Sequence, residues 1–140
     1  MHIEGTWEGY YEYGDGYVLP HFGERVGIMV TFQGENEEFS GTVKEDGSTF
    51  SVPLQAKIMG VVEYNVVSFI KTYPKNPRIK EEGKADLYFD DGELEIYHSG
   101  YWDEKSNSMY GWWSITSEFE DENGVFESVT SGIWLLKKVT

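Results

Sequence analysis

The segment LEIYHSGYW, residues 94–102, alternates two kinds of side chain along its whole length. Its even positions are apolar or glycine apart from His98, whereas its odd positions are glutamate, serine and tyrosine. Side chains on a β-strand point alternately to opposite faces, so this pattern predicts a strand with one dry face and one wet face. We therefore expect Leu94, Ile96, His98, Gly100 and Trp102 to point inward.

The same period of two recurs in most runs between turn signals rich in Gly, Asp and Asn. The predicted strands cover residues 3–13, 24–33, 38–45, 51–62, 66–73, 93–102, 109–119 and 125–138. The predicted inward sets are Ile3, Gly5, Trp7, Gly9 and Tyr11; Val26, Ile28, Val30 and Phe32; Phe39, Gly41 and Val43; Leu54, Ala56, Ile58, Gly60 and Val62; Val67, Phe69 and Lys71; and Trp134 and Leu136.

Composition agrees with an all-β class. The 140 residues include 2 Ala and 6 Leu against 43 Val, Ile, Tyr, Phe and Trp, the residues that suit a half-buried pleated surface. Consecutive hairpins with one apolar face each must close on themselves or stack, and closure removes exposed edges. We predict one domain over residues 1–140, a single antiparallel up-and-down β-barrel of eight strands. Residues 74–91 are a long connection, and a strand at 85–89 would raise the count to nine or ten.

Tracing strand direction through this barrel predicts two different ends. Four tryptophans, with Phe32 and Met109, are expected to fill the bottom: Trp7, Trp102, Trp113 and Trp134. An eight-stranded barrel has room for side chains or for one small ligand. The candidate ligand-binding residues of the mouth and lumen are Tyr11, Tyr13, Phe69, Lys71, His98, Ser128 and Thr130. The apolar loop 14–23 leaves the first strand at the mouth and is either a lid or a plug.

A second candidate site lies on the outer surface. The register of the hairpin formed by residues 93–102 and 109–119 pairs Gly100 with Gly111, His98 with Trp113 and Tyr101 with Tyr110. Its outer face then carries four aromatic residues, which we call the aromatic patch: Tyr97, Tyr101, Tyr110 and Trp112. Exposed aromatic patches mark interfaces. A homodimer, cover by residues 74–91 and a sugar-stacking platform are the alternatives.

Gly5-Thr6-Trp7 at the start and Gly132-Ile133-Trp134-Leu135-Leu136-Lys137 at the end resemble the calycin superfamily of lipocalins and avidins. The resemblance implies a barrel whose first-strand tryptophan packs at the closed end, near Lys137 or Lys138. It also implies binding of a small, usually apolar ligand through the open end. Gly5-x-Trp7-x-Gly9 looks like the opening of nitrobindin-type haem barrels as well. Because their axial histidine comes from a late strand and the last histidine here is His98, we expect no haem and no other cofactor.

Charge and residue usage exclude several functions. With 11 Lys and Arg against 25 Asp and Glu, the net charge of −14 repels nucleic acid and anionic membranes. The chain has no cysteine, and its three histidines lack metal-ligand spacing, so we expect no metal site. No leader or membrane span is recognisable, which favours the cytoplasm. No catalytic motif appears and no catalytic residue is assigned; an enzyme using His98 as acid or base is an alternative.

The resulting expectation is a non-enzymatic barrel that binds a small apolar or amphipathic molecule. The other hypotheses are a carbohydrate-binding or protein-interaction module that uses the aromatic patch, and a structural barrel without ligand.

Overall fold

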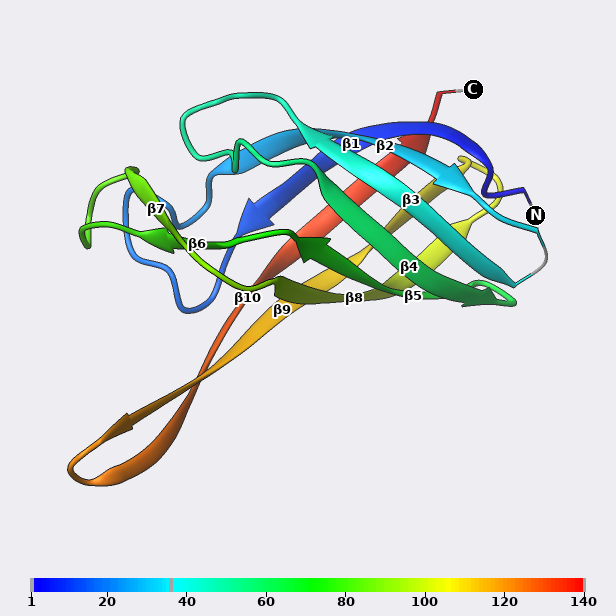
Figure 1. The fold of residues 1–140 in the computed structure, drawn as a ribbon. Coiled ribbons are helices and arrows are strands. Elements are labelled where there is room, and N and C mark those ends of the chain that lie inside the picture. The colour runs from blue at the N-terminus through cyan, green and yellow to red at the C-terminus, as the bar shows by residue number, and fades with distance from the viewer. Residues whose placement is uncertain (1, 36, 140) are drawn as a thin grey trace.

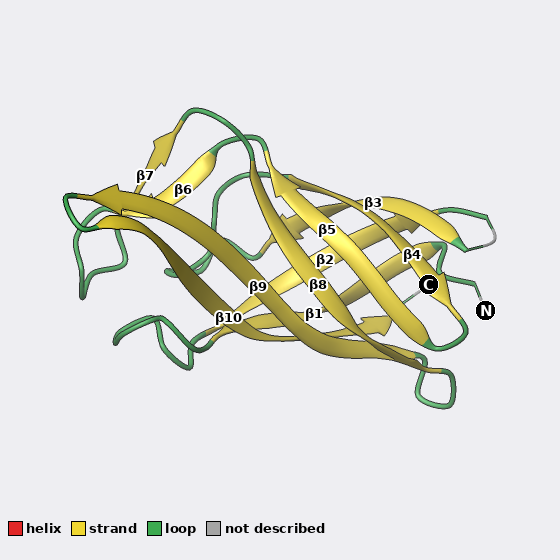
Figure 2. Ribbon diagram, turned by 90° about the horizontal axis from the view of Figure 1, so that it is seen from below, coloured by secondary structure: helices red, strands yellow, loops and turns green. Residues whose placement is uncertain are grey.

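Eight antiparallel strands close into a barrel in the order β1-β10-β9-β8-β5-β4-β3-β2 (Figure 1). The computed structural model describes residues 2–35 and 37–139. The barrel strands are β1 (Gly5–Tyr13), β2 (Arg25–Gln33), β3 (Glu38–Glu45), β4 (Ala56–Glu63), β5 (Val66–Tyr73), β8 (Leu94–Asp103), β9 (Ser108–Asp121) and β10 (Gly124–Lys138). Described residues form no helix (Figure 2). The predicted all-β, up-and-down barrel is confirmed.

The connection between β5 and β8 contains the two strands that are not part of the barrel. β6 (Asn76–Ile79) and β7 (Leu87–Asp90) pair with each other in a separate hairpin. The strand predicted near residues 85–89 is thus present, and the described chain has ten strands. The prediction of a strand from residue 51 was wrong, because β4 begins at Ala56. Pro53 lies in the preceding segment, and proline has no N–H to donate to a strand ladder.

The side chains predicted to point inward form the core of the barrel. The inward side chains Trp7, Val30, Val43, Ile58 and Val67 are almost completely buried. The predicted pairs Gly100–Gly111, His98–Trp113 and Tyr101–Tyr110 are also present in the β8–β9 register. Burial of this apolar face is the main driving force for closing the sheet into a barrel.

The β9–β10 hairpin extends well beyond the barrel. β9 pairs with β8 only from Ser108 to Ser114, and β10 pairs with β1 only from Gly132 to Lys138. Residues 115–130 are therefore paired only within the hairpin, and we call this part the arm. Figure 1 shows the arm projecting from the same end of the barrel as β6, β7 and the loop 14–23, while both termini lie at the other end.

The tryptophans are distributed along the barrel and do not gather at one end. Trp7 and Trp102 meet edge to face at the closed end, with ring centroids 5.5 Å apart. Trp134 packs on Phe69 and His98 near the middle. The prediction for Trp113 was wrong. Its ring packs against the tyrosines of the mouth described below, because strand tilt sets the height of a residue along the barrel axis and alternation does not.

Candidate functional site

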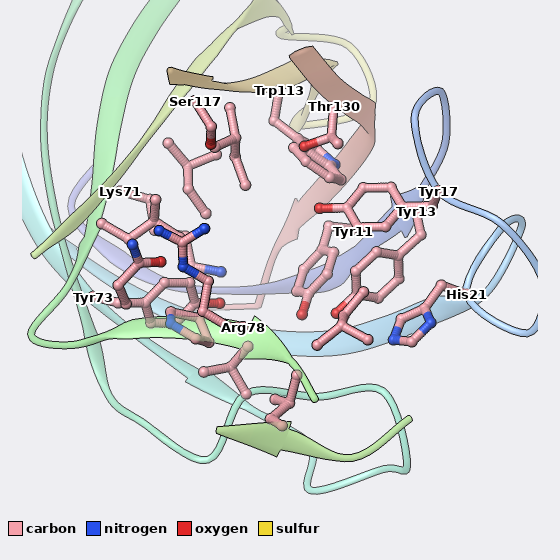
Figure 3. A pocket seen from close by; sticks show the side chains of 18 of the residues that line it. Tyr11, Tyr13, Tyr17, His21, Lys71, Tyr73, Arg78, Trp113, Ser117 and Thr130 are labelled. Carbon is pink, nitrogen blue, oxygen red and sulfur yellow. The ribbon is translucent and has the colours of Figure 1, made fainter. Parts of the chain in front are cut away.

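The open end of the barrel encloses a cavity of about 200 Å³. Strands β1, β5, β8 and β9 form its inner walls, and the β6–β7 hairpin and the base of the arm extend them outward. Figure 3 shows the tyrosines of β1 and of the loop 14–23 on one side of the cavity and Lys71, Tyr73 and Arg78 on the other. The lining residues are Tyr11, Tyr13, Tyr17, His21, Val52, Lys71, Tyr73, Asn76, Pro77, Arg78, Ile79, Leu87, Leu94, Ile96, His98, Trp113, Ile115, Ser117 and Thr130.

Edge-to-face aromatic contacts fix one wall of the cavity. Tyr13 is at the centre, with its ring 5.5 Å from Tyr11, 4.8 Å from Tyr17 and 6.4 Å from Trp113 between centroids. The Tyr13 hydroxyl donates to the Phe50 carbonyl oxygen at 2.6 Å, which anchors the ring to the loop after β3. His21 packs on Tyr13 and Phe50, so the loop 14–23 is tied to the barrel at its mouth.

A buried carboxylate organises the inner part of the site. Glu45 is the last residue of β3, and its side chain is 2% exposed. Its Oε1 accepts hydrogen bonds from the Tyr11 hydroxyl at 2.6 Å and from the Val52 backbone N–H at 2.7 Å. Its Oε2 accepts from the Tyr73 hydroxyl and from Lys71 Nζ, the latter at 3.4 Å. Both oxygens are thus used by two donors each, as a buried carboxylate requires.

Lys71 presents a buried ammonium group to the cavity. Its side chain is 4% exposed, and Nζ lies 4.7 Å from the centroid of the Tyr11 ring and 4.8 Å from that of Tyr73. Burial lowers the pKa of Lys71, and the adjacent Glu45 carboxylate opposes this shift. The ion pair and the two aromatic faces favour the charged form.

The tyrosines of the site stay protonated donors. Burial is the first cause that raises the pKa values of Tyr11, Tyr13, Tyr17 and Tyr73, and the negative charge of Glu45 adds to it for Tyr11, Tyr13 and Tyr73. At neutral pH these groups therefore donate hydrogen bonds without carrying charge.

His98 lies where the cavity meets the filled core. Its ring stacks on Phe69 with centroids 4.4 Å apart, and its Nδ1 lies 3.1 Å from the Ile96 carbonyl oxygen. Because a carbonyl only accepts, this contact places a hydrogen on Nδ1. Burial, together with the positive charge of Lys71, lowers the pKa of His98 to about 3. His98 is therefore neutral at pH 7 and leaves Nε2 as an acceptor.

Below His98 the barrel is filled. The residual void among Tyr11, Val30, Phe69, Trp134 and Leu136 measures about 10 Å³, about the minimum needed for one water molecule. Inside the barrel, the space for a small molecule is therefore at the mouth.

Five of the seven predicted ligand-binding residues line the cavity: Tyr11, Tyr13, Lys71, His98 and Thr130. Phe69 does not, because it packs deeper, against Phe32 and Trp134. Ser128 is exposed on the arm, opposite Ser117, and lies beyond the end of the closed barrel. Ser128 is on the same face of β10 as the inward residues, as predicted. At this position, however, β10 has extended beyond the closed barrel, so that face is exposed to solvent.

Sequence reasoning missed Glu45 and Tyr73, which hold the centre of the site. Extending the alternation by one more inward position would have found them. Glu45 is the next inward residue after Val43, and Tyr73 is the next inward residue after Lys71. Glu45 was assigned to a turn because Asp46-Gly47 follows it. Arg78 was missed because nothing in the sequence shows that the β6–β7 hairpin lies at the mouth.

The aromatic patch is exposed as predicted. Its four side chains are about half exposed, and the Tyr101 ring lies 6.0 Å from Tyr110 and 6.4 Å from Trp112 between centroids. The alternative in which residues 74–91 cover the patch is wrong, because β6 and β7 contribute to the mouth cavity instead.

The fold and the site together define a class, a closed eight-stranded antiparallel barrel that is solid below and hollow at its mouth. Comparison of the chain with family models, with curated proteins and with solved structures finds no match in any of the three. Within residues 2–35 and 37–139, no group of three or more His, Asp and Glu side chains has a geometry that could hold a metal ion. The same residues include no helix of the length and apolar character needed to span a membrane.

Proposed function

We propose that this protein binds a small amphipathic molecule in the mouth cavity without transforming it. The observation that carries the proposal is the cavity itself, with aromatic walls and a buried Lys71–Glu45 pair, above a core that leaves almost no other space. Ligand-binding sites are typically apolar hollows in which a small number of polar groups point toward the same space.

The size of the cavity restricts the ligand. An apolar protein cavity of about 150 Å³ holds benzene, whereas pockets for drug-sized molecules begin near 300 Å³. At about 200 Å³ the mouth cavity fits a molecule built on a single ring. The rings of Tyr11, Tyr13 and Trp113 offer stacking or edge contacts to such a molecule.

Binding is favoured over catalysis by the state of the titratable groups. His98 has a pKa of about 3, so at pH 7 it is a weak base and is not the imidazolium that a histidine general acid must be. Both oxygens of Glu45 are occupied by hydrogen-bond donors. Neither His98 nor Glu45 is therefore free to act as an acid or a base toward a bound molecule.

We also propose kinship with the calycin barrels. The contact that supports it is at the closed end, where Lys138 Nζ lies 6.0 Å from the centroid of the buried Trp7 ring. The same Nζ donates to the His2 carbonyl oxygen at 2.8 Å and so joins the two ends of the chain.

A thermal-shift screen of single-ring compounds tests the binding proposal. Thr130→Phe fills the cavity, and Thr116→Phe is a matched change at an exposed position of the arm. We expect compounds that raise the Tm of the unaltered protein and of Thr116→Phe but not that of Thr130→Phe. A screen without hits, or hits that stabilise all three proteins equally, would overturn the proposal.

A second candidate function is self-association through the aromatic patch. The patch lies in an outer surface that is four strands wide and carries one charged group, Glu63, at its corner. The register aligns its residues in three rows, Met59–Ile70–Tyr97–Ser114, Val61–Ser68–Ser99–Trp112 and Glu63–Val66–Tyr101–Tyr110.

The low charge of this surface supports a second copy of this chain as the occupant. Two chains of net charge −14 repel each other over most of their surfaces, and an almost uncharged surface minimises that repulsion. Tyrosine and serine hydroxyls both donate and accept hydrogen bonds, so this surface can complement itself about a twofold axis.

Sedimentation velocity tests this second candidate. A dimer is expected for the unaltered protein and a monomer for Trp112→Glu, while Val125→Glu, on the exposed arm, stays dimeric. A monomer throughout would contradict the dimer. Glycan binding that is lost in Trp112→Ala would assign the patch to sugar recognition instead.

A further inference from the structure

We infer that the ligand of the mouth cavity is a small single-ring carboxylic acid, bound as its anion with the carboxylate toward Lys71 and Trp113. This inference rests on the proposed binding function and names the chemical class of the ligand. It is carried by a count of hydrogen-bond donors and acceptors around the cavity.

Glu45 has no capacity left for a ligand. Four donors already meet its two oxygens: the hydroxyls of Tyr11 and Tyr73, the Val52 N–H and Lys71 Nζ. Glu45 is also absent from the lining of the cavity. A positively charged ligand would thus find no free carboxylate among the lining residues that the structure describes.

Lys71, by contrast, keeps donors available. An ammonium group has three N–H bonds, and in the part of the chain that the structure describes Glu45 is its one hydrogen-bond partner, at 3.4 Å. Lys71 lines the cavity, so a ligand atom there can accept from the remaining N–H bonds.

Trp113 supplies a second unused donor. Its side chain is 4% exposed, and its Nε1–H has no hydrogen-bond partner among residues 2–35 and 37–139. Buried polar groups in native proteins are almost always paired, so an unpaired indole N–H that borders a cavity can donate to an acceptor of a bound molecule. The buried indole N–H of Trp102 also has no partner among the described residues, but Trp102 does not line the cavity. Trp113 and Lys71 both line the cavity and both contact the ring of Tyr11, with distances to its centroid of 6.2 Å from the Trp113 ring and 4.7 Å from Lys71 Nζ, so a ligand bound beside Tyr11 has a donor on each side.

The charge around the cavity favours an anion as well. The chain has a net charge of −14, yet none of the lining residues in the described ranges is Asp or Glu, while Lys71 and Arg78 are both present. Arg78 pairs with Asp90 at 3.2 Å, and both side chains are about half exposed. Arg78 can therefore contact an anion at the entrance while its guanidinium stays partly hydrated. Burial strengthens the attraction of Lys71 for a ligand carboxylate, and the Glu45 carboxylate at 3.4 Å offsets part of it.

Three planar probes of nearly equal shape test the inference: benzoate, benzamide and benzamidine, which are negative, neutral and positive at pH 7. Isothermal titration calorimetry at one salt concentration is expected to give a Kd for benzoate about tenfold lower than for benzamide, the ratio typical of one charge-assisted hydrogen bond. Benzamidine is expected to bind weakest.

Two variants locate the effect. The pair Glu45→Gln with Lys71→Met removes both charges together, so neither is left buried alone, and it should abolish the preference for benzoate while benzamide still binds. Trp113→Phe keeps an aromatic ring without the N–H and should weaken benzoate binding about threefold to tenfold, as expected for one hydrogen bond.

The outcomes separate this inference from the proposed function. Equal binding of the three probes, tighter binding of benzamidine, or a preference for benzoate that survives Glu45→Gln with Lys71→Met would overturn the carboxylate inference and leave the binding site intact. Binding of none of the three would overturn the carboxylate inference, and the thermal-shift screen would then decide the proposed function separately.

Discussion

Lys71 Nζ and Glu45 Oε2 lie 3.4 Å apart at a depth where the two side chains are 4% and 2% exposed. The pair joins β3 to β5, which are not neighbours in the barrel, and it does so directly beneath the mouth cavity. A buried ion pair is not necessarily more stable than an apolar core, but it fixes the geometry of the groups around it when the carboxylate accepts from several donors, as Glu45 does. Here that geometry positions the tyrosines of the cavity wall.

Removing one member of this pair should be costly. Glu45→Leu leaves the Lys71 ammonium buried without a counter-ion, and we expect the free energy of unfolding to fall by about 3 to 5 kcal/mol. Urea denaturation monitored by tryptophan fluorescence measures it. The matched control is Glu12→Leu, which breaks the exposed pair with Arg25 and should cost less than about 1 kcal/mol. Equal effects of the two substitutions would contradict the role assigned to Glu45.

The stability of the protein should fall as the pH is lowered from neutral. The folded pKa of His98, about 3, lies below its ordinary value of 6.5, so below pH 6.5 the unfolded chain takes up a proton that the folded chain does not. This difference alone should reduce the free energy of unfolding by about 2 kcal/mol between pH 7.5 and pH 5. His21 adds to the decrease, since burial lowers its pKa as well.

Comparing His98→Gln with the unaltered protein isolates this effect, because glutamine can still donate to the Ile96 carbonyl but does not titrate. Chemical denaturation at several pH values is expected to give a flatter profile for the variant. Parallel profiles of the two proteins would show that His98 is protonated in the folded state and would contradict its burial as a neutral ring.

Trp113→Phe should have little effect on stability. The indole N–H of Trp113 has no partner among the described residues, so the substitution loses some packing but no hydrogen bond. We expect a loss of about 1 kcal/mol or less. By contrast, Trp134→Phe removes the N–H that donates to the Trp112 carbonyl at 3.0 Å and should cost more. Urea denaturation measures both losses. A larger loss of stability for Trp113→Phe than for Trp134→Phe would mean that the Trp113 N–H is already paired.

Gly16 should be the sensitive glycine of the loop 14–23. Its φ of +93° disfavours other residues, and a Cβ there would lie 2.8 Å from Thr130 Cγ2 and 2.9 Å from the Val129 carbonyl oxygen. Gly23 has a similar φ of +84° but open space around it, so Gly23→Ala measures the backbone strain alone. We expect Gly23→Ala to cost about 1 kcal/mol and Gly16→Ala clearly more. Equal costs in thermal unfolding would show that the loop does not rest on the arm.

The fold could be predicted from the sequence because alternation of side chains reports directly which face of a strand is buried. Trp7, Ile58 and Ile96 all point inward for that reason. Alternation does not report position along the barrel axis, which depends on strand tilt and stagger. This is why Trp113 was assigned to the wrong end and why Ser128 was placed in a cavity that its strand passes by.

The candidate site could be predicted only in part for a related reason. Tyr11, Lys71 and His98 are conspicuous as polar groups on an inward face. Glu45 gives them a chemical role and follows the inward alternation of its strand, but it lies at the strand end, where Asp46 and Gly47 signal a turn. Arg78 comes from a hairpin outside the barrel, where no local pattern marks it.

The most direct test of a ligand site at the mouth uses the indole N–H signals of the tryptophans in ¹H–¹⁵N correlation spectra during a titration with benzoate. We predict a saturable change in the Trp113 signal, while the signal of Trp112, on the outer surface next to it in sequence, stays where it is. A titration that shifts Trp112 and leaves Trp113 unchanged would place any binding outside the barrel and would contradict a ligand site at the mouth.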